Sequence, residues 1–192
     1  MKLILASASP RRVELLGRLG VPFTVEPAHA DERESHPDGP AALVTYNAAM
    51  KAQAIGVTFP DRWILGSDTT VARGEKIYGK PRDLADARRM LAELAGETHT
   101  VFTAVCLLRP ASGQSRCFCE SARVTFKSLD ADAIDAYIRL VNPLDKAGAY
   151  GIQAHRERII ASVEGSVETV MGLPLQALAQ QLREIGWSVP KA

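Results

Sequence analysis

Apolar positions recur along the chain with the spacing of short strands and of amphipathic helices. The run from Lys2 to Ala6 is short and apolar, as in a buried strand. Ser9 then stands as a helix N-cap with Pro10 at the first helical position, and apolar residues follow at helical spacing until Gly20. The pattern therefore predicts a strand that leads directly into a helix.

The rest of the chain continues to alternate between the two periodicities. A helix is predicted over Ala41–Ile55, and a strand over Trp63–Leu65 that ends at Gly66-Ser67-Asp68. The remaining predicted elements are a helix capped by Asp83 and stopped by Gly96, two strands over Thr98–Leu108 and Cys117–Phe126 joined by a Pro110–Gly113 turn, and helices over Asp132–Leu140 and Leu175–Ile185. This mixture predicts an α/β fold with a partly antiparallel sheet.

Composition narrows the class of protein. The 192 residues suit one domain, either a single large one or one with two lobes. The 46% hydrophobic and 23% charged fractions are ordinary for a soluble protein. A net charge of +1 argues against a surface built for a nucleic acid polymer. No apolar run approaches the length of a membrane span or of a signal-peptide core, so we expect neither a membrane partner nor a secreted protein.

The cysteines and histidines predict no metal centre. Three cysteines in a chain of this size indicate reduced thiols and a cytoplasmic protein. Cys117 and Cys119 share one face of a predicted strand, and no second Cys or His pair follows at zinc spacing, so we interpret them as packed thiols. The four histidines lack the mutual spacing of a metal site or a catalytic dyad and are interpreted as structural or surface residues.

The first candidate for chemistry is the segment from Ser7 to Arg12. Small residues at the start of a helix let an anion approach unpaired backbone N–H groups at the positive end of the helix dipole. The hydroxyls of Ser7 and Ser9 add donors, and Arg11 and Arg12 add charge that suits phosphate. The alternative is a capped surface helix with two solvated arginines.

Asp68 is the second candidate because it follows an apolar strand at its expected carboxyl end, where open α/β sheets bind ligands. A carboxylate there can hold a divalent cation or accept a proton from water. The alternative is an aspartate that begins a turn.

Four further residues have weaker signals. Lys80 lies between Gly79 and Pro81 on a stiff loop, although an exposed loop lysine is the commoner case. Lys51 has mostly apolar helical neighbours, so its stem should lie near the core and its head at a cleft edge. Glu32 lies in an acidic loop that solvation alone would explain. Gln153 offers the donor and acceptor that a base edge requires, in a segment that otherwise reads as a tight packing loop.

Taken together, these segments resemble the Maf family of nucleotide pyrophosphatases. The matching pieces occur in family order over nearly the whole chain: Ser7–Leu16, Asp31-Glu32, Lys51-Ala52, Gly66–Val71, Tyr78–Pro81, Asp145–Gln153 and Gly172–Leu175. The resemblance implies a fold similar to that of inosine-triphosphate pyrophosphatases, with an elongated mixed sheet and two lobes around a nucleotide cleft. It also implies a homodimer and a requirement for a divalent cation, Mg²⁺ or Mn²⁺.

The implied reaction is hydrolysis of a nucleoside triphosphate to the monophosphate and pyrophosphate, with Asp68 as general base. The resemblance also assigns roles to the other residues: Lys51 and Lys80 are catalytic cations, Glu32 and Asp68 hold the metal, and Ser7, Ser9, Arg11, Arg12, Thr69 and Gln153 bind the substrate. Phosphoryl chemistry requires charge neutralisation and a positioned water, which this set supplies.

Three positions resemble the branch of the family that prefers dTTP and UTP. They are Arg11, Thr69 and Gln153, where the branch active on 7-methyl-GTP carries an aromatic, a glutamine and, nearby, a glutamate. A glutamine can pair with the edge of uracil or thymine. Two other functions stay open: a nucleotide-binding regulator of cell division with little turnover, and the same chemistry on inosine or methylated guanine nucleotides.

Overall fold

The computed structural model describes residues 2–189. The strands are β1 (Leu3–Leu5), β2 (Phe23–Val25), β3 (Ile64–Arg73), β4 (Lys76–Tyr78), β5 (Thr98–Arg109), β6 (Gln114–Phe126) and β7 (Ile160–Glu164). The helices are α1 (Pro10–Arg18), α2 (Pro40–Gly56), α3 (Leu84–Leu94), α4 (Ala131–Leu140), α5 (Arg156–Ile159), α6 (Val167–Met171) and α7 (Leu175–Glu184), with 3₁₀ turns η1 (Pro110–Ser112) and η2 (Ala147–Ala149). None of the helices described is long and apolar enough to cross a membrane.

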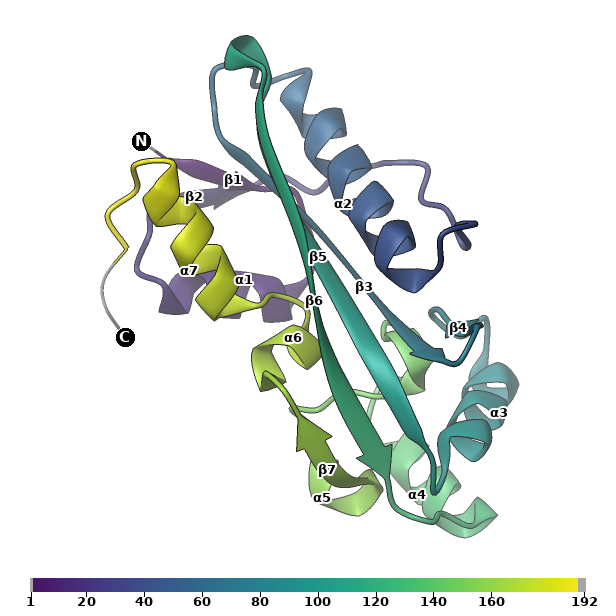
Figure 1. Ribbon diagram of the computed structural model, residues 1–192. Helices are drawn as coiled ribbons and strands as arrows, with labels where there is room; N and C mark the ends of the chain where they lie inside the picture. The colour runs from purple at the N-terminus through teal and green to yellow at the C-terminus, as the bar shows by residue number, and fades with distance from the viewer. Residues whose placement is uncertain (1, 190–192) are drawn as a thin grey trace. The chain divides into compact units, whose positions relative to one another are not determined.

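The strands form a mixed sheet in the order β2-β1-β3-β5-β6-β7, with β4 paired to β3 (Figure 1). The long strands β5 and β6 are neighbours joined by η1, as the sequence predicts. The prediction of an α/β fold with a mixed, partly antiparallel sheet is confirmed, because β1 pairs in parallel with both β2 and β3 while β4 and β7 pair antiparallel with their neighbours.

The chain divides into two compact units, which we describe separately. Of the described residues, the first unit contains 2–68, Thr103–Glu120 and 172–189. The second contains Thr69–Phe102 and Ser121–Met171. The strands β3, β5 and β6 each contribute residues to both units.

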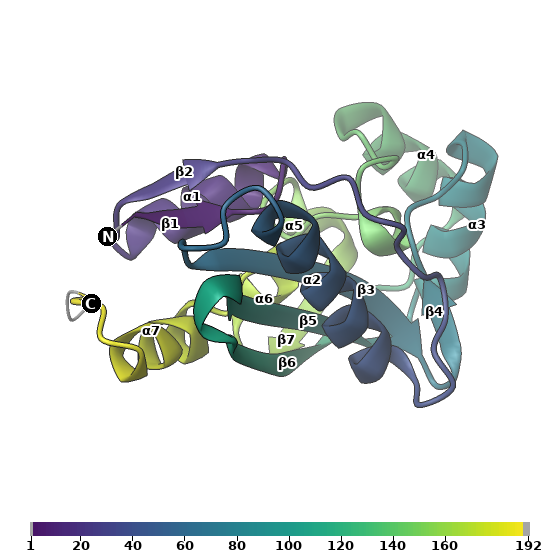
Figure 2. The same cartoon turned by 90° about the horizontal axis from the view of Figure 1, so that it is seen from above.

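In the first unit, β1 and the start of β3 form the centre of a parallel arrangement. Leu5 of β1 lies opposite Val25 on one side and Leu65 on the other. Helix α2 runs beside β3 in both views (Figures 1 and 2), and its Ala52 packs in one apolar cluster with Ile4 of β1 and Ile64 of β3. This packing brings one face of α2 against the sheet.

In the second unit, a group of aromatic side chains forms part of the core. His99 makes edge contacts with Phe126 and Tyr150, and its Nε2 lies 2.8 Å from the Tyr150 hydroxyl. These contacts of a buried side chain confirm the interpretation of His99 as a structural residue.

Helices α3 and α4 of the same unit lie side by side in both views (Figures 1 and 2).

Strand β3 is longer than the sequence predicts. The sequence predicts a strand over Trp63–Leu65 that ends at Gly66-Ser67-Asp68, but β3 continues through Asp68 to Arg73. The reason is that the later part of the strand has β-compatible residues and new pairing, since Val71 lies opposite Tyr78 of β4. Asp68 therefore lies within a strand rather than in the loop after one.

The prediction of three reduced thiols is wrong. Cys106 of β5 and Cys117 of β6 form a disulfide, with their Cα atoms 4.2 Å apart, while Cys119 is free. The β5–β6 hairpin places the first two cysteines opposite each other. Spacing along one strand groups Cys117 with Cys119, whereas the pairing of the two strands brings Cys117 to Cys106.

Candidate active site

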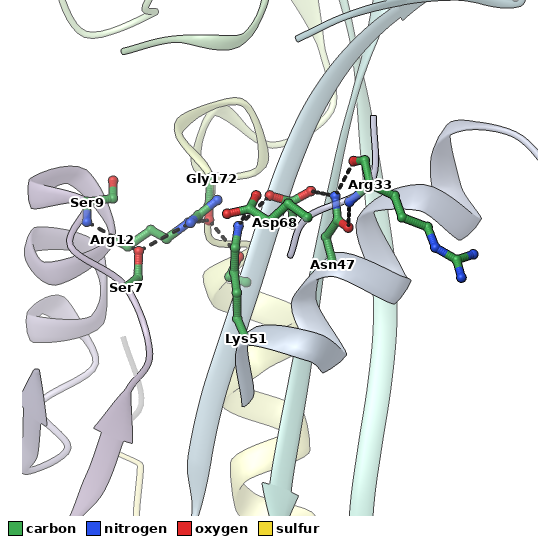
Figure 3. Close-up of polar contacts among 10 residues, drawn as sticks. Ser7, Ser9, Arg12, Arg33, Asn47, Lys51, Asp68 and Gly172 are labelled. Carbon is green, nitrogen blue, oxygen red and sulfur yellow. Dashed lines mark hydrogen bonds and ion pairs between the residues drawn. The ribbon is translucent and has the colours of Figure 1, made fainter. Parts of the chain in front are cut away.

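Asp68 is held at both carboxylate oxygens by side chains of helix α2 (Figure 3). The Lys51 ammonium donates to Oδ1 at 2.7 Å, and the Asn47 amide donates from Nδ2 to Oδ2 at 3.1 Å. Asp68 is only 9% exposed, so these contacts replace most of its hydration. Hydrogen bonds to a charged group are stronger than neutral ones, and two of them fix the plane of the carboxylate.

Helix α2 reaches Asp68 because β3 carries a glycine two residues earlier. A Cβ at Gly66 would lie 2.0 Å from the Ala48 carbonyl oxygen and 2.8 Å from the Ala52 nitrogen, both in the α2 backbone. The helix backbone therefore packs directly on the strand. This close approach buries the stem of Lys51 and leaves its ammonium group at Asp68.

Lys51 also joins Asp68 to a second carboxylate. Its Nζ lies 2.8 Å from Oε2 of Glu32, whose side chain is 46% exposed. We call Glu32, Lys51 and Asp68 the carboxylate–lysine cluster. Its buried ammonium is matched by two carboxylates, so the cluster holds two oxygen ligands close to a single cationic position.

A second set of contacts surrounds Arg12 at the start of α1 (Figure 3). Its Nη1 donates to Oγ of Ser7 at 3.2 Å and its Nε donates to the carbonyl of Gly172 at 3.0 Å. Ser7 Oγ also accepts from the Ser9 backbone N–H at 3.2 Å, and Ser67 Oγ donates to Gly172 at 3.1 Å. Ser9 occupies the N-cap position as predicted, but its side chain makes no cap hydrogen bond.

The two sets are electrostatically coupled. Burial lowers the pKa of Arg12 from its ordinary value, while the charges of Asp68 and Glu32 oppose that shift and Arg11 adds to it. The guanidinium starts from so high a pKa that it stays charged. Arg12 and Lys51 are thus two cations near two carboxylates, and Arg11 adds a third cation beside Arg12. Such an environment attracts an anion that carries its own divalent cation.

The second unit brings the Lys80 loop against the segment that carries Gln153. The Gly148 N–H donates to the Gly79 carbonyl at 3.0 Å, and Gly148 has φ 67°, a conformation that suits glycine. The Tyr137 hydroxyl accepts from the Gly151 N–H at 3.2 Å. Lys80 and Gln153 are both exposed. The segment is therefore a packing loop, as its glycines indicate, and one that also presents Gln153.

The donor set fits a magnesium ion that is shared with a substrate. In residues 2–189 no group of three or more His, Cys, Asp or Glu side chains could hold a metal. Mg²⁺ usually takes only one or two carboxylates and completes its shell with water and substrate phosphates. Glu32 and Asp68, which meet at one ammonium in this structure, are oxygen ligands of that kind.

A model of the family described as "Maf: Maf-like protein" matches residues 2–185 of the chain. The chain belongs to the Maf family. A protein of Moorella thermoacetica named dTTP/UTP pyrophosphatase is 45% identical over 188 residues, which cover 98% of this chain and 97% of that one. A Myxococcus xanthus protein of the same name is 42% identical over 188 residues, covering 98% and 94% of the two chains.

Among solved structures, the Ham1 protein of Staphylococcus aureus is similar with a TM-score of 0.46 and 10% identity, over 66% of this chain and 72% of that one. The similarity of the fold to inosine-triphosphate pyrophosphatases, which the Maf resemblance implies, stays a prediction.

The residues predicted for the Maf site fall in both units. The first unit brings together those around Asp68 and Arg12, namely Ser7, Ser9, Arg11, Arg12, Glu32, Lys51 and Asp68. Thr69, Lys80 and Gln153 belong to the second unit. The predicted roles of all these residues stay predictions.

Three contacting residues were missed by the sequence reading: Asn47, Ser67 and Gly172. Asn47 had a usable signal, because it lies four residues before Lys51 and hence on the same face of α2. Ser67 and Gly172 are far apart in the sequence, and only the fold brings them into contact.

Proposed function

We propose that this chain hydrolyses dTTP and UTP to the nucleoside monophosphate and pyrophosphate. The observation that carries the proposal is the buried Asp68 carboxylate, fixed by Lys51 beside Glu32 and near the cationic start of α1. Relatives that match almost the whole chain are named dTTP/UTP pyrophosphatase, which supports the reaction and its substrates.

In the proposed reaction, Asp68 accepts a proton from the water that attacks the α-phosphorus. The new bond joins the water oxygen to the α-phosphorus, and the bond between that atom and the α–β bridging oxygen breaks. Pyrophosphate leaves with the bridging oxygen. Each carboxylate oxygen of Asp68 has accepted one hydrogen bond and retains a lone pair, so the group can still take this proton.

The cations of the first unit would stabilise the charge that builds on the phosphate oxygens. Arg12 is oriented by its bonds to Ser7 and Gly172, so little reorganisation is needed when the substrate binds. Arg11 adds a second guanidinium at the same helix start. Such positioning and electrostatic stabilisation supply most of the catalysis in phosphoryl transfer.

A divalent cation is part of the proposal, with Mg²⁺ the first choice and Mn²⁺ an alternative. Glu32 and Asp68 would hold it, and when bound it would neutralise charge on the substrate phosphates. Lys51 contacts both carboxylates in this structure, so its part is to keep them together and to balance their charge.

The preference for pyrimidines rests on Arg11, Thr69 and Gln153. Gln153 is exposed, and its amide can donate to one polar atom of a base edge and accept from another. We assign base recognition to Gln153 on this chemistry and on the names of the relatives.

The experiment is a screen of purified protein with Mg²⁺ against common and modified nucleoside triphosphates, with pyrophosphate and orthophosphate measured separately. We expect pyrophosphate from dTTP and UTP, and none above background with Asp68→Asn. Pyrophosphate from purine nucleotides alone would keep the reaction and overturn the assignment of Gln153. The absence of any product would overturn the enzyme proposal and favour a nucleotide-binding regulator.

We further propose that the protein is a homodimer, as the family resemblance implies, and that it is cytoplasmic. Light scattering coupled to gel filtration should give about twice the chain mass of 20.8 kDa. A mass equal to one chain would refute the dimer. The compartment can be tested by cell fractionation with an antibody against the native protein.

A further inference from the structure

We propose that Asn47 is a positioning residue that holds Asp68 and the Glu32 segment in register with each other. The inference rests on the proposed function, because it assigns a role within the same site. It starts from the observation that one buried side chain, 3% exposed, contacts both carboxylate-bearing parts of the site (Figure 3).

The contacts of Asn47 use both ends of its amide. Oδ1 accepts from the Arg33 backbone N–H at 2.9 Å, and Nδ2 donates to the Arg33 carbonyl at 3.0 Å and to Asp68 Oδ2 at 3.1 Å. In the opposite amide orientation, Oδ1 would face two other acceptors, the Arg33 carbonyl and Asp68 Oδ2. The amide NH₂ group would then face the Arg33 backbone N–H, another donor. The amide orientation is therefore determined by its partners.

The two bonds to Arg33 anchor the chain directly next to Glu32. Residues 26–39 form no helix or strand, so this stretch lacks the regular backbone pairing that holds other parts of the first unit. Asn47 pairs with the backbone there as a neighbouring strand would. The Arg33 guanidinium also lies 3.9 Å from the centre of the Tyr46 ring, so two consecutive residues of α2 hold the same point of the loop.

Asn47 and Lys51 both hold Asp68 and the segment that carries Glu32, by different contacts. They lie four residues apart on one face of α2, and each takes a different oxygen of Asp68. Lys51 contacts the side chain of Glu32, whereas the Asn47 side chain contacts the backbone of the next residue, Arg33. A flexible lysine alone would permit Glu32 to move with its loop, so Asn47 supplies the restraint.

Replacement of Asn47 by other residues of similar size would remove this restraint in distinct ways. Leucine would leave the Asp68 oxygen and both Arg33 backbone groups without their partner. Aspartate is nearly the same shape but lacks the two N–H donors, and it adds a carboxylate beside Asp68. Both variants are useful because a common effect cannot then be attributed to one new side chain.

The test compares Asn47→Leu and Asn47→Asp with Gln53→Ala, a change at an exposed position on the same helix. Hydrogen–deuterium exchange is measured on the unliganded, full-length protein, and kcat and KM are measured with UTP. We expect exchange in residues 29–36 to accelerate roughly tenfold in both Asn47 variants, with α4 unchanged. We expect kcat to fall about 10- to 100-fold, and KM to change less. Gln53→Ala should match the wild type in both measurements.

Unchanged exchange in residues 29–36 would overturn the proposal, whatever happens to kcat. So would a kcat close to that of the wild type when that exchange is accelerated, because the restraint would then be irrelevant to the reaction. Acceleration that is equal across the chain would show a general loss of stability and also reject a local positioning role. If the wild type itself has no turnover, the proposed function fails, and the exchange measurement still decides whether Asn47 holds the segment.

Discussion

The substitution Gly66→Ala tests whether the close packing of α2 on β3 builds the site. The added Cβ would lie 2.0 Å from the Ala48 carbonyl oxygen, whereas real Cβ contacts below 3.0 Å essentially do not occur. The helix must therefore withdraw by about 1 Å, since both close atoms belong to the backbone and no side chain can rotate away.

A withdrawal of this size separates α2 from Asp68. The Asn47–Asp68 bond would lengthen from 3.1 Å, and at about 4.1 Å it no longer exists as a hydrogen bond. The longer Lys51 side chain can follow the carboxylate, so its contact should survive. Overpacking of this kind typically costs about 1–3 kcal/mol of stability. A misplacement of about 1 Å near a reacting group can reduce turnover about 100-fold.

The assay combines thermal unfolding, followed by circular dichroism, with pyrophosphate release from UTP. The matched control is Gly17→Ala in α1, where a Cβ would meet nothing within 4 Å. The control should gain about 0.5–1 kcal/mol, because alanine is the better helix former, and keep its kcat. If Gly66→Ala unfolds at the wild-type temperature and keeps the wild-type kcat, then close packing at Gly66 does not hold the site together.

Four further outcomes are expected. Asp68→Asn should lower kcat about 100- to 10,000-fold with nucleotide binding largely kept, measured by steady-state kinetics and calorimetry; an equal loss of binding would make Asp68 mainly a metal ligand. Gln153→Glu should reduce the preference for UTP over GTP more than it reduces phosphate binding, and an unchanged ratio of kcat/KM values would remove its role in base recognition. Burial lowers the pKa of His99 to about 4, so the unfolded chain binds a proton more readily than the folded chain between pH 6.5 and 4. The free energy of unfolding should therefore fall by at most about 3 kcal/mol as the pH is lowered through that range, and His99→Phe should flatten this dependence in denaturant titrations. Reduction of the Cys106–Cys117 disulfide, which spans 11 positions, should cost about 3 kcal/mol in the same titrations, and non-reducing peptide mapping should find the two cysteines linked.

The elements that the sequence predicts well are those with their own periodicity and end signals. Helix α3 begins after Asp83, whose side chain accepts from the Asp86 N–H at 2.7 Å as an N-cap does. The elements it missed are β2, β4, α5, β7 and α6, which have three to five residues each. A strand such as Phe23–Val25 is defined by its pairing with β1, and three residues carry too little pattern to reveal a partner.

The site could be predicted as a set of residues but not as a set of contacts. Charged groups in recognisable segments identified Asp68, Lys51 and Glu32, and the structure brings these three together. The pairing of Lys51 with both carboxylates depends on how closely α2 approaches β3. That distance is determined by Gly66, which as a sequence feature looks like an ordinary turn glycine. The disulfide could not be predicted for a similar reason, because the pairing register of the hairpin determines which cysteines lie opposite each other.

The placement of Asp68 refines the rule that led to it. Ligands of open α/β sheets bind beyond the carboxyl ends of parallel strands, and β3 continues well past Asp68. The strand that ends is β1: its parallel register with β3 stops at Leu5 and Leu65, and Ser7 follows two residues after Leu5. The rule therefore holds for β1, while β3 contributes Asp68 from its interior.

This arrangement explains why Gly66, Ser67 and Asp68 act as one packing unit. Gly66 and Asp68 both face α2, whereas Ser67 faces Gly172: the glycine admits the backbone of α2, the aspartate accepts from two side chains of α2, and the serine hydroxyl donates to the Gly172 carbonyl. Because these contacts differ, substitutions at the three positions should differ in kind. A change at Gly66 should affect stability and turnover together. Asp68→Asn should affect turnover most, and it should also lower stability, because an amide has a single acceptor oxygen and cannot accept from both Lys51 and Asn47 as the carboxylate does. Ser67→Ala should act through Gly172, which also accepts from Arg12, and so should weaken substrate binding more than the chemical step.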